Sequence, residues 1–323
     1  MHRKLMIILT LLCGVGGAVL RGLELAFAFE PGTSLLAPWH AYSVSLIVLS
    51  FVFAAAAIFL TLRNKKPESE PVSALWLAAE LAAALMLAAS GALSFSPDPS
   101  ATMLARAVYG IMAIVSAGCI GVLALAVRNR RLTATSGFGF IATVPVFWSC
   151  YGLCLDFWGH SGISTRSAYM YGMFALIFLT LALFSAAGFI FRDAKRKRGS
   201  LYCLLGIFFA AVTLGGSLLA QGSFAPPPSQ LAGVAVLPTD SMLRLGFVVL
   251  HLLCLYHAIE KGRFSFEPAK KAPVTTEASD IPAYEILGDE LEAELSRLEG
   301  NENFGTGLEA EERFEDMDED SGE

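Results

Sequence analysis

The sequence is poor in charged residues. Only 16% of its 323 residues are Asp, Glu, Lys or Arg, whereas a soluble globular domain contains roughly 25%. Hydrophobic residues make up 55%, and the mean hydropathy is +0.59. Most of the chain is therefore expected to lie in lipid rather than in water.

Motifs of the common enzyme and cofactor classes are also missing. The chain contains no phosphate-binding P-loop, no HExxH zinc motif, no GxSxG nucleophile elbow, no aspartate-rich pair for lipid diphosphates and no histidine pair placed for haem. The segment 156–162, expected in an exterior loop, brings an acid, an imidazole and a hydroxyl together, but sequence adjacency is not the geometry of a catalytic triad. The sequence therefore predicts no cofactor and ranks an enzyme behind the two functions considered below.

The six cysteines form neither a disulfide framework nor a metal motif. All of them fall inside apolar runs, and Cys150 and Cys154, which share a helix face, have no further Cys nearby to complete a metal site. We interpret the cysteines as small buried hydrophobic side chains and predict no metal.

Long apolar runs recur along the chain. A helix needs about 20 apolar residues to cross a hydrocarbon core of about 30 Å. Eight runs reach this length, at 5–27, 39–62, 73–95, 102–127, 136–157, 168–191, 200–220 and 241–259. The sequence predicts an all-α integral membrane protein with eight transmembrane helices in contact with the lipid bilayer. The first run also resembles a cleaved signal peptide, but its length favours a retained span.

Basic residues are concentrated in alternate connections between these runs. By the positive-inside rule, this pattern puts both termini in the cytoplasm. The compact loops favour a multi-pass protein of a bacterial plasma membrane. Because topology already explains the basic residues, nucleic-acid binding is not supported.

A proline-rich segment occurs twice. Residues 94–100 read SFSPDPS and precede Arg106, and residues 223–229 read SFAPPPS and precede Arg244. Further matches recur in the same order: Gly22 with Gly152, Tyr42 with Tyr169, and Arg63 with Arg192. We predict two parallel four-helix repeats, 1–131 and 132–262, related by a pseudo-two-fold axis along the membrane normal, an arrangement known from transporters.

The C-terminal segment 263–323 differs sharply from the rest. Residues 1–261 contain 18 Lys and Arg against 10 Asp and Glu, a net charge of +8, whereas 262–323 contain 5 against 19, a net charge of −14. This composition predicts a largely disordered acidic cytoplasmic tail. Within it, leucines at helical spacing predict a short amphipathic helix that either is simply solvated or docks a cytoplasmic protein. They are Leu287, Leu291, Leu295 and Leu298.

Duplicated polar residues at the outer ends of the spans suggest a ligand site. Arg106 and Arg244, with Tyr42 and Tyr169, would surround a common axis, and Arg binds carboxylates or phosphates through two parallel hydrogen bonds. The alternative is that both arginines anchor helix ends to lipid phosphates.

Other ionisable residues lie deeper in the predicted spans. Glu80 lies too far inside to snorkel, so it is either a proton-coupled group or a neutral carboxyl that hydrogen-bonds across a helix interface. Arg21 and Glu24 are spaced to pair with each other, as a structural pair or as part of a ligand site. We interpret His251 as a satisfied packing residue.

Two functions follow from these features. The first is a transporter-like or permease-like protein that binds a small anionic solute or lipid headgroup from the outer side. The second is a membrane-embedded sensor or scaffold that acts through its acidic tail.

Overall fold

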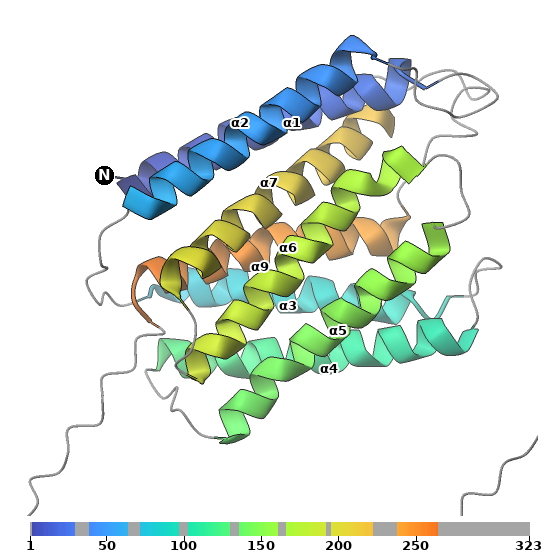
Figure 1. Ribbon diagram of the computed structural model, residues 1–323. Helices are drawn as coiled ribbons and strands as arrows, with labels where there is room; N and C mark the ends of the chain where they lie inside the picture. Colours follow the sequence, from blue (N-terminus) through green and yellow to red (C-terminus); the bar gives the residue numbers. More distant parts are fainter. Residues whose placement is uncertain are drawn as a thin grey trace, which may run out of the picture. The chain divides into compact units, whose positions relative to one another are not determined.

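The computed structural model describes residues 2–29, 39–63, 72–96, 103–129, 136–160, 166–191, 195–221 and 238–263. Each range contains one long α-helix (Figure 1). The helices are α1 (His2–Phe27), α2 (Ala41–Arg63), α3 (Ala74–Leu93), α4 (Met103–Arg128), α5 (Ser136–His160), α6 (Arg166–Ile190), α7 (Arg196–Gln221) and α9 (Thr239–Glu260). The tail and its predicted leucine helix lie outside the described residues.

All eight helices are long and apolar enough to cross a membrane, which confirms the predicted number of spans. Large apolar side chains cover their outward faces; Phe51, Leu85 and Phe140 are each more than 70% exposed. Such a surface is stable in lipid and not in water. The protein is therefore an integral, multi-pass membrane protein.

Successive helices run in opposite directions (Figure 1). The end of each helix therefore lies at the same end of the bundle as the start of the next helix. Arg63 and Arg128 end α2 and α4, Arg196 begins α7, and Lys261 follows α9. We call the end of the bundle that holds these four residues the basic end. Lys197 at this end donates to the Leu62 carbonyl at 2.6 Å, which ties the start of α7 to the last turn of α2.

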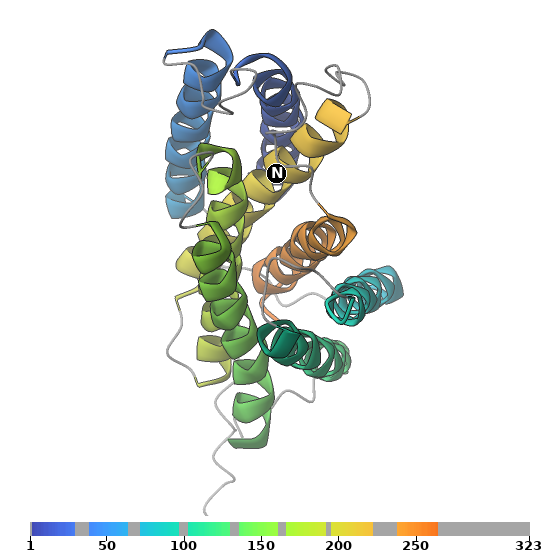
Figure 2. The same cartoon turned by 90° about the vertical axis from the view of Figure 1, so that its right-hand side faces the viewer.

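Helix α7 lies at the centre of the packing. It contacts α1, α2, α6 and α9, and its buried face includes Phe208, which stacks on Phe53 of α2 at 4.4 Å. Helices α3, α4 and α9 lie together on one side, away from the α1–α2 hairpin (Figure 2). Helix α9 thus connects the α3–α4 pair to α7.

Helix pairing follows the predicted repeats in part. The pairs α1–α2 and α3–α4 of the first half recur as α5–α6 and α7–α9 in the second half. Contacts between the two halves do not repeat symmetrically. Helix α1 packs on α7, whereas its counterpart α5 packs on α4 and α6. Helix α3 packs on α4 and α9. The contacts between the two halves thus differ from one half to the other, and the pseudo-two-fold arrangement stays a prediction from the sequence.

Helices α3 and α4 approach closely where Gly91 faces Gly110. A Cβ atom added to Gly110 would lie 2.7 Å from the Gly91 carbonyl oxygen and 3.0 Å from the Phe95 ring. Close backbone approach of this kind holds helices together in lipid, where the hydrophobic effect does not act between them. Gly118 on the same helix has no atom within 4 Å of an added Cβ.

We expect Gly110→Ala to lower the free energy of unfolding by about 1–3 kcal/mol, the usual cost of overpacking. Gly118→Ala is the matched control, and it should leave stability unchanged or raise it by up to about 1 kcal/mol because alanine favours helix. Denaturant unfolding in detergent micelles measures both. Equal losses in the two variants would contradict this account of the α3–α4 contact.

Candidate functional site

Helix α9 places two ionisable side chains on its inner face. Arg244 and His251 are seven residues apart, which is about two turns and about 10 Å along the axis. Each meets a carboxyl group from another helix: Arg244 meets Asp156 of α5, and His251 meets Glu80 of α3. The candidate site consists of these two pairs and the side chains between them.

Glu80 and His251 form a buried acid–base pair. The Glu80 Oε1 atom lies 2.5 Å from Nδ1 of His251, and the residues are only 4% and 5% exposed. Glu80 is the seventh residue of α3, about 10 Å from the start of the helix at 1.5 Å per residue. His251, interpreted from the sequence as a satisfied packing residue, thus has a hydrogen-bond partner on another helix.

Each member of this pair has one polar atom left over. Oε2 of Glu80 and Nε2 of His251 are buried and make no hydrogen bond within normal geometry among the described residues, although the Cys254 thiol lies beside the Glu80 carboxyl. An unsatisfied buried donor or acceptor costs about 1–3 kcal/mol, so native proteins keep few of them, and those that remain call for an explanation. A group that must gain and lose a proton is one such explanation.

A cavity of about 50 Å³ adjoins the pair. Side chains of α3, α4, α5, α6 and α9 line it, and they are apolar apart from Glu80, His251 and Trp76. Trp76 is held in place by its indole N–H, which donates to the Cys254 carbonyl at 2.8 Å. Pro145 also lines the cavity and has no N–H, so the carbonyl of Ile141, one turn earlier in α5, lacks its helical donor.

Arg244 and Asp156 form a bidentate ion pair. Nη1 and Nη2 of Arg244 donate to Oδ1 and Oδ2 of Asp156 at 3.1 and 2.9 Å, and the two side chains are 15% and 22% exposed. Tyr109 of α4 lies beside the same guanidinium. Asp156 was expected in an exterior loop, but it lies in the last turns of α5, because the helix continues to His160.

Three aromatic side chains separate the two pairs. Trp148 lies between Tyr109 and Phe247, with ring centroids 5.9 and 5.7 Å away, and Phe247 stacks on the His251 ring at 5.2 Å. All three are buried. We call Tyr109, Trp148 and Phe247 the aromatic layer. It fills the space between Arg244 and His251 with closely packed rings.

The four residues predicted to surround a common axis are not brought together. Tyr42 begins α2, which contacts α1 and α7, whereas Arg106 lies on α4, which contacts α3 and α5. The Nε of Arg106 donates to the Ser94 carbonyl at 3.2 Å, and Tyr42 packs against the His40 ring. Tyr169 lies in the first turn of α6. Of the four, only Arg244 belongs to the site described above.

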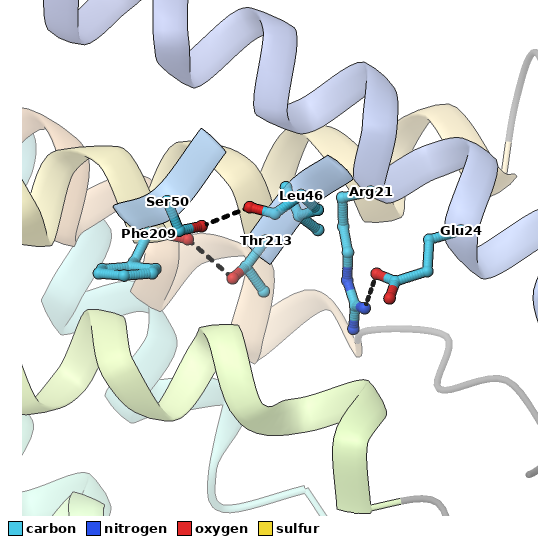
Figure 3. A network of polar contacts seen from close by, with 6 residues as sticks. All are labelled: Arg21, Glu24, Leu46, Ser50, Phe209 and Thr213. Carbon is cyan, nitrogen blue, oxygen red and sulfur yellow. Dashed lines mark hydrogen bonds and ion pairs between the residues drawn. The ribbon is translucent and has the colours of Figure 1, made fainter. Parts of the chain in front are cut away.

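Arg21 and Glu24 lie on α1 at the end of the bundle opposite the basic end. Both are buried, and the Arg21 guanidinium pairs with the Glu24 carboxylate (Figure 3). The guanidinium also lies 5.1 Å from the centre of the Tyr171 ring, a cation–π contact. Gly216 of α7 makes room for the Arg21 stem, since a Cβ there would lie 2.4 Å from its Cγ.

The described residues contain no group of three or more His, Cys, Asp and Glu side chains placed to hold a metal ion. Comparisons of the chain with protein-family models, with characterised proteins and with solved structures give no match. The buried pairs are therefore the features of the described residues whose chemistry points to a function.

Proposed function

We propose that the protein is a transporter-type membrane protein in which the Glu80–His251 pair binds and releases a proton. The observation that carries the proposal is the pair itself: an acid and a base in contact at membrane depth, each with a polar atom unsatisfied. Ionisable groups inside transmembrane helices are costly, and they mark proton relays and ion pathways in pumps and transporters.

The pair has the chemistry that proton coupling requires. With one proton, it is neutral overall, either as carboxylate and imidazolium or as carboxylic acid and imidazole. A second proton makes it a buried cation, and loss of the proton makes it a buried anion. Because a buried net charge is expensive, either change favours a rearrangement that admits water or a counter-ion.

Arg244 is the residue at which we place the anionic solute. Its guanidinium already holds a carboxylate, that of Asp156, through two parallel hydrogen bonds. A solute with a carboxylate or phosphate group fits the same fork and would bind by displacing Asp156. Compared with the four-residue site predicted from the sequence, this proposal retains Arg244 alone.

The two-repeat division is retained as a proposal about the sequence, with boundaries at 1–131 and 132–262. Tyr109 and Phe247 are equivalent positions when Arg106 is aligned with Arg244, since each lies three residues further on. Both pack against Trp148. This shared contact supports a common origin of α4 and α9.

The test uses vesicles that contain the purified protein and a pH-sensitive dye in the lumen. Small carboxylates and phosphates are added outside one at a time, and a solute that enters with a proton acidifies the lumen. We expect Glu80→Gln and His251→Gln each to reduce acidification to the rate of protein-free vesicles, because each variant removes one titrating member of the pair.

Glu260→Gln is the matched control. Glu260 is also a buried acid, but it lies at the basic end, where it binds Arg196 at 3.2 Å and Ser200 at 2.7 Å. This variant should keep proton movement. If no solute in the panel drives acidification, or if Glu80→Gln retains it in full, the proposal is wrong.

A further inference from the structure

The cavity lies on one side of the Glu80–His251 pair. Its lining includes Trp76, one turn nearer the basic end than Glu80 on α3, and Ala258, two turns nearer that end than His251 on α9. It also includes Val127, the residue before Arg128 at the end of α4. The cavity therefore extends from the pair toward the basic end.

We infer that this cavity holds water and connects the pair to the basic end alone. The inference rests on the proposed function and adds the route and the sidedness of proton exchange. In each exchange, a hydronium ion in the cavity gives a proton to the pair and becomes water, and release is the reverse. No other reactant is needed.

The cavity has the room and the polar partners that water requires. A buried water needs about 10–15 Å³, and the cavity measures about 50 Å³. Glu80 and His251 both line it, and each has a buried polar atom without a hydrogen-bond partner among the described residues. A water molecule that bridged Oε2 of Glu80 and Nε2 of His251 would satisfy both atoms.

The aromatic layer closes the other side of the pair. Phe247 covers the His251 ring, and Trp148 and Tyr109 extend the layer across α5 and α4. Phe247 is 0% and Trp148 is 1% exposed, so the layer is buried within the bundle. A proton arriving from the opposite end meets this layer before it reaches His251.

The experiment follows the pair after a rapid pH change on one side of a vesicle membrane. Trp76 lines the same cavity, so its fluorescence reports the charge of the pair, and the difference from Trp76→Phe isolates its signal. Orientation is known from protease cleavage beyond Arg263, because the chain leaves α9 at the basic end. We expect a fast Glu80-dependent response only in molecules whose basic end faces the pH change.

Two kinds of variant test the route. Ala142→Leu fills the cavity from α5 and should slow the response by an order of magnitude or more, and Ala186→Val, a smaller change in the same lining, should slow it less. Ala82→Leu, on the exposed face of α3, is the control and should leave the rate unchanged. Trp148→Ala opens the aromatic layer and should add a response from the opposite end.

The outcomes separate the route from the proposed function. Equal response rates from the two ends, or an unchanged rate in folded Ala142→Leu and Ala186→Val, would overturn the inference while leaving the Glu80-dependent signal and the proposed function intact. A wild-type protein with no Glu80-dependent signal from either end would overturn both.

Discussion

Replacing Glu24 with glutamine should lower the free energy of unfolding by about 3–5 kcal/mol, the usual cost of removing one partner of a buried ion pair. Both side chains are at most 4% exposed. The Tyr171 ring remains beside the guanidinium, and its cation–π contact, worth about 2 kcal/mol or more when desolvated, offsets part of the loss. Denaturant unfolding in detergent measures the loss.

The double variant Arg21→Met/Glu24→Leu decides what this pair is for. Apolar residues of similar volume often replace a buried ion pair at no cost. Methionine also fits the space beside Gly216 that the Arg21 stem occupies. If the pair is structural, we expect the double variant to unfold near the wild-type midpoint and to transport normally. A stable double variant that has lost transport would assign the pair to a ligand site instead.

The spans could be predicted from the sequence because lipid imposes a simple rule on length and composition. A helix such as α4 must be about 20 residues long and apolar on every side that faces lipid. Its predicted bounds, 102–127, differ from Met103–Arg128 by one residue at each end. Arg21 and Glu24 also followed from sequence, since their spacing brings them together on one helix.

The pairs on α9 could not be found in the same way. His251 lies 171 residues from Glu80, and Arg244 lies 88 residues from Asp156. Which helices become neighbours depends on the packing of small side chains, and many apolar sequences satisfy that packing equally well. Helix periodicity carries no information about it.

The depth of each ionisable residue along its helix was the sequence feature that could have indicated the Glu80–His251 and Arg244–Asp156 pairs. Glu80 is six residues from the start of α3, and His251 is nine residues from the end of α9, both measured from the basic end. Arg244 and Asp156 are five and four residues from the opposite ends of their helices. An acid and a base at similar depth in lipid gain greatly from pairing, because each is costly alone.

Removing the carboxylate of Asp156 should leave the Arg244 guanidinium available to an added carboxylate. The free energy of unfolding should then depend on the concentration of that carboxylate. Asp156→Ala should lower the free energy of unfolding by about 2 kcal/mol, within the range for hydrogen bonds to charged groups, since the pair is only partly buried. Formate or acetate should restore most of this loss by occupying the two vacated hydrogen-bonding positions. Thermal unfolding with increasing carboxylate, at constant ionic strength with chloride, measures the rescue.

Arg244→Ala is the control for this rescue, because it destabilises the same pair but leaves nothing for a carboxylate to bind. Rescue of Asp156→Ala but not of Arg244→Ala, with no effect on the wild type, would identify an anion site that Asp156 keeps closed. Stabilisation of the wild type by a larger carboxylate or a phosphate would go further, since a ligand at 100 times its dissociation constant contributes about 2.7 kcal/mol. Such a ligand must outcompete Asp156, and it would then be the solute to test for proton-coupled entry. Failure of every anion in both proteins would mean that the Arg244 fork only holds α5 against α9, and the proposed anionic solute would lose its binding site.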